Sequence, residues 1–228
     1  MLARIIDLLS PRACVICERR LTTQEHVICM PCNLHLPRTG FASDAYENEL
    51  ARLFWGRLPI ERCAALFYYQ SHSPTAKIIY ETKYHNHPEI AAYMGFIAAE
   101  EFASQGFFDD IDVIIPVPLS KSRQRQRGYN QSLEIAKWVS QSTGLPINDN
   151  AVIRKDFKGS QTDKDRWARN DNGKDVFELV DKEGIEDKHI LLIDDIITTG
   201  ATLSSCGTVI SSVSGIKISI MSLGYTKG

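Results

Sequence analysis

Two adjacent carboxylates follow an apolar run near the C-terminal end of the sequence. The stretch Ile190-Leu-Leu-Ile-Asp-Asp-Ile-Ile-Thr-Thr-Gly-Ala-Thr202 opens with four apolar residues, which predict a buried parallel strand. Asp194 and Asp195 then lie at the carboxyl end of that strand, where open α/β sheets bind their ligands. Carboxylates at such a place can accept hydrogen bonds from sugar hydroxyls, or can bind a second phosphate through a divalent cation such as magnesium.

The loop after the acidic pair has the features of an anion site. Its glycine lets the backbone turn closely, and the N-terminus of the following helix presents free N–H groups. A phosphate monoester fits this loop, and a ligand with a phosphate, a diol and a metal-bound diphosphate is phosphoribosyl diphosphate. The loop residues expected to bind it are Thr198, Thr199, Gly200, Ala201 and Thr202.

Other classes of protein also end an apolar strand in an acidic pair. The magnesium strand of a nucleotide hydrolase requires an upstream Gly-x-x-x-x-Gly-Lys-Ser/Thr loop, and the sequence has none. A receiver-type acidic cluster needs partner carboxylates early in the chain, which are not evident. A purely structural strand and turn needs neither the two acids nor a glycine after Thr-Thr. The pattern therefore favours phosphoribosyl diphosphate.

Four of the six cysteines lie close together near the N-terminal end, which indicates a metal site and not a disulfide framework. Cys14 and Cys17 form one Cys-x-x-Cys pair, and Cys29 and Cys32 form the second. Two such pairs supply four thiolates for a tetrahedral, structural zinc ion, which would contribute much of the folding energy of so short a unit. A redox couple is the alternative for a single pair, and two nearby histidines are alternative ligands.

A basic segment alternates cations with polar residues. In an extended conformation Lys121, Arg123, Arg125 and Arg127 would share one face, and we expect that stripe to bind a nucleic-acid backbone or a diphosphate. Tyr129 adds a ring that can stack on a base. The segment follows a predicted strand and should lie near the ligand edge; a solvated positive loop is the alternative.

Short apolar runs alternate with helical patterns along the rest of the chain. The predicted strands are 63–69, 111–116, 152–153, 176–180, 189–194 and 216–223. The predicted helices are 76–83, 88–103, 133–139 and 202–212. This order favours an α/β fold with a mostly parallel sheet flanked by helices. The polar stretch 154–175 is too long for a connector and is predicted to be an active-site flap.

Composition and charge narrow the class of protein. The net charge of -2 and the pI of about 6.3 argue against binding to nucleic acid or membrane through overall charge, although a local patch can still do so. Arg4 and Asp7 interrupt the apolar start, which fits a short helix and not a signal peptide. No uninterrupted apolar run approaches the ~18 residues of a membrane span. We expect a soluble, cytoplasmic protein without membrane insertion.

The segment 190–202 closely resembles the ligand-binding motif of type I phosphoribosyltransferases. The resemblance implies that the acidic pair holds the ribose hydroxyls and that the threonine loop cradles the 5′-phosphate. It further implies that Lys83 and Tyr84 belong to a short diphosphate loop, and that the flap closes over the diphosphate to exclude water. The flap residues expected at the ligand are Gln161, Lys164, Arg166 and Arg169.

Several motifs together narrow the resemblance to one family. The sequence is similar, over nearly its whole length, to the ComF family, which includes ComFC-like and GntX-like proteins. The motifs that carry this similarity are the four-cysteine unit, Lys83-Tyr84, Pro116-Val-Pro118, Arg127-Gly-Tyr-Asn-Gln131, Gly159-Ser-Gln-Thr162 and the C-terminal motif. The resemblance implies a zinc-ribbon-like unit at residues 1–40 and a phosphoribosyltransferase-like domain at 41–228, with Arg127 at the substrate. It also implies an association with DNA uptake in natural competence.

Two functions are expected from these observations. The first is a phosphoribosyltransferase, an enzyme of the glycosyltransferase class and of nucleoside metabolism, in which Asp194 and Asp195 are catalytic. Magnesium and Lys83 would hold the diphosphate, and the motifs leave the acceptor and the oligomeric state open. The second is a non-catalytic module that senses the same ligand. Its basic segment and zinc unit would bind single-stranded DNA or a protein of DNA uptake.

Overall fold

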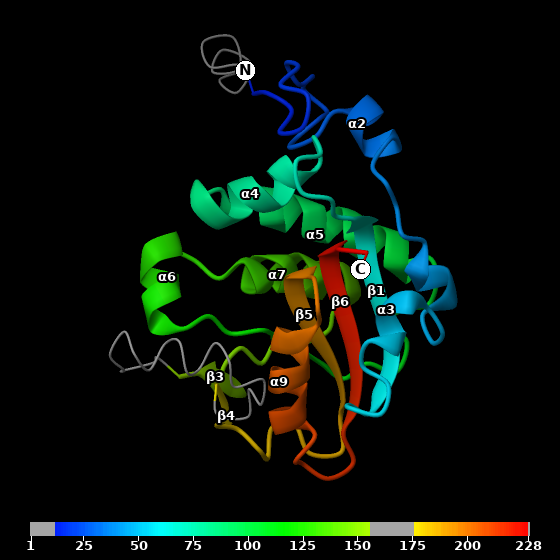
Figure 1. Ribbon diagram of the computed structural model, residues 1–228, viewed down its shortest axis with the longest axis vertical. Coiled ribbons are helices and arrows are strands. Elements are labelled where there is room, and N and C mark those ends of the chain that lie inside the picture. The colour runs from blue at the N-terminus through cyan, green and yellow to red at the C-terminus, as the bar shows by residue number, and fades with distance from the viewer. Residues whose placement is uncertain (1–11, 156–175, 228) are drawn as a thin grey trace.

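A parallel four-stranded sheet forms the centre of the computed structural model, which describes residues 12–155 and 176–227 (Figure 1). The strand order is β1-β6-β5-β2, and two further strands, β3 and β4, pair antiparallel with each other outside this sheet. The expected α/β class with a mostly parallel sheet is therefore confirmed. The strands are β1 (Ile60–Tyr68), β2 (Val113–Pro116), β3 (Val152–Arg154), β4 (Phe177–Leu179), β5 (His189–Ile197) and β6 (Lys217–Tyr225).

Helices cover both faces of the sheet (Figure 1). α9 (Ala201–Ile210) lies over one face, whereas α5 (Pro88–Ala103) and α7 (Gln131–Thr143) pack against each other over the other face. α4 (Ala76–Tyr84) packs on α5, and α6 (Lys121–Arg127) lies at the edge of the molecule. The shorter helices before β1 are α2 (Met30–Leu34), η1 (Phe41–Asp44) and α3 (Glu49–Arg52).

The central strands are buried because their sequences are apolar on both faces. The first five residues of β5, from His189 to Ile193, are all buried, as expected for a parallel strand between two layers of helices. The helix layer packs closely because α5 carries Gly95 at its crossing with α7. A Cβ atom at this position would lie 3.0 Å from the Cα and from the carbonyl oxygen of Ile135. A larger residue would push the two helices apart.

The cysteine-rich part of the chain lies next to α4 and α5. Lys77 Nζ of α4 forms an ion pair with Glu18 Oε1 at 2.6 Å, and the ring of His26 lies 5.5 Å from that of Tyr93 on α5. The short helix expected at residues 1–10 and most of the expected flap lie outside the described residues. None of the described helices is long and apolar enough to cross a bilayer.

Candidate functional site

The acidic pair lies where a long strand of the sheet runs past a short one. β5 continues beside β6 as far as Ile197, whereas its pairing with β2 ends at Ile193. The expectation that the strand itself ends at Asp194 is therefore wrong, because backbone pairing with β6 extends it. The ligand edge arises instead from the short neighbour β2, beyond whose end Asp194 and Asp195 lie.

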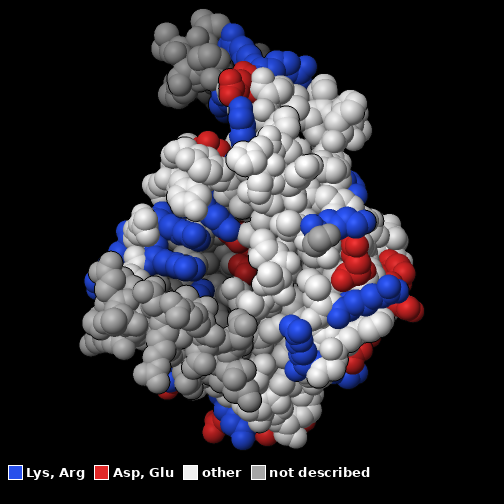
Figure 2. All heavy atoms as spheres, viewed as in Figure 1, with Lys and Arg blue, Asp and Glu red and all other residues white. Residues whose placement is uncertain are grey.

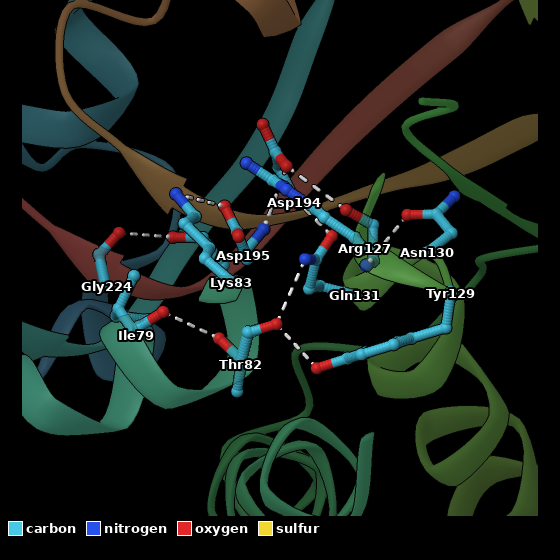
Figure 3. Close-up of polar contacts among 12 residues, drawn as sticks. Ile79, Thr82, Lys83, Arg127, Tyr129, Asn130, Gln131, Asp194, Asp195 and Gly224 are labelled. Carbon is cyan, nitrogen blue, oxygen red and sulfur yellow. Dashed lines mark hydrogen bonds and ion pairs between the residues drawn. The ribbon is translucent and has the colours of Figure 1, made fainter. Parts of the chain in front are cut away.

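The two carboxylates have different partners (Figure 3). Asp194 Oδ1 accepts hydrogen bonds from the Ser132 hydroxyl at 3.1 Å and from the backbone N–H of Asp195 at 2.9 Å. Asp195 is 6% exposed, and its Oδ1 forms an ion pair with Lys83 Nζ at 3.2 Å. Burial and the neighbouring charge of Asp195 raise the pKa of Asp194 to about 7. At pH 7 the Asp194 carboxyl is therefore about half protonated, whereas a free aspartate would be fully ionised.

The threonine loop turns sharply into α9. Gly200 has a φ of 73°, and a Cβ atom there would lie 2.9 Å from the ring of Phe54, so both the conformation and the space require glycine. The loop and the first residues of α9 line a small pocket next to Asp194, and Thr198 and Thr199 are exposed to it. The residues that line this pocket include all five that the sequence predicts at the phosphate: Thr198, Thr199, Gly200, Ala201 and Thr202.

The basic segment is a helix and not the extended stripe that we expected. The Ser120 hydroxyl accepts the backbone N–H of Arg123 at 3.3 Å and so caps the N-terminus of α6. Side chains four residues apart share a face of a helix, whereas those two apart do not. Arg123 and Arg127 therefore lie on one side of α6, and Lys121 and Arg125 lie on the other.

A larger cavity of about 230 Å³ joins the acidic pair to one face of α6. Figure 2 shows Lys and Arg side chains gathered beside a hollow in which acidic atoms are visible. The cavity brings together four cations from separate parts of the chain: Lys83 of α4, Arg123 and Arg127 of α6, and Arg154 of β3. Lys121 and Arg125 do not line it.

Positive charge exceeds negative charge in this cavity. Lys83 is balanced by Asp195, but none of the three arginines forms an ion pair with a carboxylate among residues 12–155 and 176–227. Burial, followed by the repulsion of nearby Arg123, lowers the pKa of Arg154 from its ordinary value. Such a concentration of unbalanced cations attracts an anion with several charges.

The other predicted residues lie elsewhere. Tyr84 is 62% exposed and its ring lies 5.0 Å from that of Tyr80, away from the cavity lining. Lys83 belongs to the last turn of α4 and not to a loop. The ring of Tyr129 is not a free surface for stacking on a base, because its hydroxyl donates a hydrogen bond to the Thr82 carbonyl. Burial raises its pKa. Gln161, Lys164, Arg166 and Arg169 lie outside the described residues.

Three polar residues of the cavity lining were not predicted as site residues from the sequence. Gln131 and Ser132 line the cavity at the start of α7. Gln131 is the last residue of the Arg127-Gly-Tyr-Asn-Gln131 motif and Ser132 follows it directly, so the motif was the available signal. Arg154 follows the apolar pair of a very short strand, and nothing local distinguishes it from a surface arginine. It reaches the cavity because β3 lies near α6 in the folded chain.

The four cysteines of the N-terminal part meet in space. Their sulfur atoms all lie within 4.8 Å of one another, and the Sγ atoms of Cys17 and Cys29 are 3.7 Å apart. Zinc–sulfur bonds of about 2.3 Å at tetrahedral angles place sulfurs about 3.8 Å apart, so the cluster can hold a zinc ion. The two nearby histidines are not part of this cluster: His35 Nδ1 lies 2.7 Å from the Pro31 carbonyl oxygen, and the ring of His26 packs on Tyr93.

Comparisons with known proteins identify relatives of the chain. It is 33% identical over 113 residues to competence protein F of Haemophilus influenzae, a match that covers 49% of each chain. It is 24% identical over 204 residues to DNA utilization protein YhgH of Escherichia coli, covering 85% of this chain and 88% of that one. Competence protein ComFC of Bacillus subtilis is 32% identical over 91 residues, covering 40% of this chain and 35% of its own length. The chain thus spans about half the length of competence protein F.

Solved structures give weaker likenesses. Hypoxanthine-guanine phosphoribosyltransferase of Leishmania tarentolae in complex with GMP matches with a TM-score of 0.31 and 14% identity, over 59% of this chain and 66% of that one. Adenine phosphoribosyltransferase of the same organism matches with a TM-score of 0.35 and 13% identity, over 78% and 88%. At such low scores neither likeness carries an argument.

No protein-family model matches the chain. The sequence relatives nevertheless point to the same family as the motifs. Two of them are named competence proteins, and the match to YhgH extends over most of both chains. These matches confirm the resemblance predicted from the sequence: the chain is similar to competence protein F and ComFC over part of its length, and to YhgH over most of it.

Proposed function

We propose that this chain binds phosphoribosyl diphosphate together with a divalent cation, and transfers or cleaves its phosphoribosyl group. The observation that carries the proposal is the arrangement around Asp194 and Asp195. A threonine loop with a helix N-terminus lines a small pocket next to Asp194, and the adjoining larger cavity joins Thr198 and Thr202 to the acidic pair and to a cluster of unbalanced cations. A ligand that carries a monophosphate, a diol and a diphosphate matches this set of groups.

The threonine loop is proposed to hold the 5′-phosphate. The hydroxyls of Thr198, Thr199 and Thr202 and the free N–H groups at the start of α9 can all donate hydrogen bonds to its oxygens. Gly200 allows the backbone to approach the phosphate closely. Asp194 and Asp195, next to the loop, would then accept hydrogen bonds from the ribose hydroxyls.

The cations are proposed to hold the diphosphate. Lys83, Arg123, Arg127 and Arg154 can neutralise a leaving group on which charge develops as the bond to the ribose breaks. Asp194 and Asp195 could hold a magnesium ion together with the diphosphate, since two carboxylates alone are too few for an all-protein magnesium site; the ion would supply positive charge to the leaving group. We retain Gln161 and Arg166 as part of the proposed site. The rate enhancement would come mainly from positioning and electrostatics.

Turnover distinguishes an enzyme from a sensing module. The test measures diphosphate release from phosphoribosyl diphosphate and magnesium, with a panel of candidate acceptors and with water alone. We expect release by the wild type and at least 100-fold less by an Asp194→Asn/Asp195→Asn variant. Tight binding without release in every reaction would favour the non-catalytic module, and absence of binding would refute the proposed ligand.

The second candidate function is binding of single-stranded DNA, or of a protein of DNA uptake, by the same chain. The names of the relatives, competence protein and DNA utilization protein, motivate it. The specific observation is that Lys121 and Arg125 are exposed and lie outside the cavity. We expect Lys121→Ala/Arg125→Ala to weaken salt-dependent single-strand binding and to spare the small ligand, whereas Arg123→Ala/Arg127→Ala should weaken binding of the small ligand. Equal effects of both pairs on both ligands would contradict this division.

The zinc ion is proposed to be structural, because four sulfur ligands leave no open coordination position. We further propose that residues 1–40 form the zinc unit, that residues 41–228 form the ligand-binding domain, and that the protein acts in the cytoplasm.

A further inference from the structure

The carbonyl group of Thr82 receives two side-chain hydrogen bonds from the segment before and at the start of α7 (Figure 3). The Tyr129 hydroxyl donates to it at 2.5 Å, and Gln131 Nε2 donates to it at 3.0 Å. α4 ends at Tyr84, so this carbonyl has no N–H partner within the helix and requires one from elsewhere. The two donors therefore fix the last turn of α4, which carries Lys83.

The other end of the Gln131 side chain reaches α6. Gln131 Oε1 accepts a hydrogen bond from Arg127 Nη1 at 3.1 Å. A carboxamide has its donor and its acceptor in one rigid plane, so the two bonds hold it in a single orientation. Gln131 is 1% exposed, which leaves no water to replace either partner.

A continuous chain of contacts thus joins the two sides of the cavity. It runs from the Arg127 guanidinium through the Gln131 carboxamide to the Thr82 carbonyl, and from the adjacent Lys83 to Asp195. Both cations line the cavity, although they are 44 positions apart in the sequence and belong to different helices. The Gln131 side chain is hydrogen-bonded both to Arg127 and to the helical turn that carries Lys83.

We infer that Gln131 is a positioning residue that makes Arg127 and Lys83 act as one unit toward the diphosphate of the ligand. This inference rests on the proposed function for the identity of the ligand, but the link itself exists in the free protein. Removal of Arg127 frees Gln131 Oε1, loosens the carboxamide and so weakens the hold on the turn that carries Lys83. The two cations then contribute to affinity together and not independently.

A double-mutant cycle measures this coupling. The affinity of magnesium and phosphoribosyl diphosphate is determined by calorimetry for the wild type, Arg127→Ala, Lys83→Ala and the double variant. We expect the double variant to bind the ligand at least about five-fold more tightly than the product of the two single-variant losses of affinity predicts. The same cycle in a Gln131→Met background should be additive within about two-fold, whereas Gln141→Met, an exposed glutamine on the same helix, should preserve the coupling.

A ligand-free measurement separates the failure of this inference from the failure of the proposed function. Amide hydrogen exchange of residues 79–86 should accelerate in Gln131→Met and in Arg127→Ala. It should stay at the wild-type rate in Arg123→Ala, which removes a cation from the same face of α6 without touching Gln131. Equal exchange in the two arginine variants would overturn the inference, as would coupling that survives Gln131→Met. If the wild type binds no phosphoribosyl diphosphate, the proposed function fails and the exchange result alone decides the role of Gln131.

Discussion

Replacement of Asp194 by asparagine should stabilise the free protein at neutral pH while it weakens ligand binding. Asp194 is held beside Asp195 in a poorly solvated place, and its pKa is raised to about 7 from an ordinary value of 3.8. The folded protein therefore favours the neutral form of this side chain over the charged form. Asparagine keeps the shape and still accepts the hydrogen bonds of Ser132 and of the Asp195 N–H, but it never carries the charge.

The magnitude follows from the difference between the folded and unfolded pKa. A raised folded pKa means that wild-type stability is lost as the pH rises, from about pH 4, where the unfolded chain ionises, to about pH 7, where Asp194 ionises in the folded protein. One pKa unit corresponds to about 1.4 kcal/mol, so the full cost is about 4 kcal/mol above pH 7. Partial solvation of the side chain reduces this, and we expect Asp194→Asn to gain about 2 to 4 kcal/mol at pH 8.

Denaturant titrations of the ligand-free protein at pH 4, 5, 6, 7 and 8 test this reasoning. The advantage of Asp194→Asn should be near zero at pH 4 and should grow through pH 7, with a melting temperature roughly 5 to 15 °C higher at pH 8. Asp195→Asn is the matched control, because it removes the ion-pair partner of Lys83 and should not produce the same gain. An advantage of Asp194→Asn that does not change with pH, or a loss of stability at pH 8, would refute the electrostatic explanation.

Three further predictions concern other parts of the chain. The purified protein should contain one zinc ion per chain, and Cys14→Ser should lower both the zinc content and the melting temperature; a metal-free wild type would contradict the zinc site. Gly200→Ala should cost about 1 to 2 kcal/mol through its left-handed backbone, with an added loss from the clash with Phe54, and should weaken ligand binding at least ten-fold; unchanged affinity would count against the loop as the phosphate site. Asp181→Asn should destabilise the protein above about pH 4 and have little effect below it, the opposite pH dependence to Asp194→Asn. The reason is that hydrogen bonds from Asn148 and from the Gly184 N–H lower the pKa of Asp181; an equal effect at pH 3 and pH 7 would contradict this.

Patterns within short segments predicted many of the helices and strands, and they predicted that several candidate residues lie close together. The apolar run of β5, the acidic pair and the threonine loop are contiguous in the chain, so their proximity required no knowledge of the fold. The two Cys-x-x-Cys pairs similarly meet because each pair forms a tight turn, and only one short connection has to bring the turns together. The helix pattern at 88–103 matches α5 in both bounds.

The basic segment shows where local patterns were insufficient. Alternating cations at 121, 123, 125 and 127 indicate one face of a strand, but the same residues divide between two faces of a helix. Ser120 provides a helix cap, and this signal was weaker in the sequence than the alternation that pointed to an extended chain. As a result, two of the four cations face the cavity and two do not.

The chemical groups available to this protein can be read directly from its residues: two carboxylates, a threonine loop, four thiolates and a set of cations. Which of the cations lie near the carboxylates depends on the folded arrangement of the chain. Lys83 reaches Asp195 from a position 112 residues away, Arg154 joins the cavity from a separate pair of strands, and Gln131 lies between two helices. Local spacing follows from backbone geometry and can be read along the chain. Contacts between distant segments depend instead on how helices pack on the sheet, and a single sequence does not state that packing.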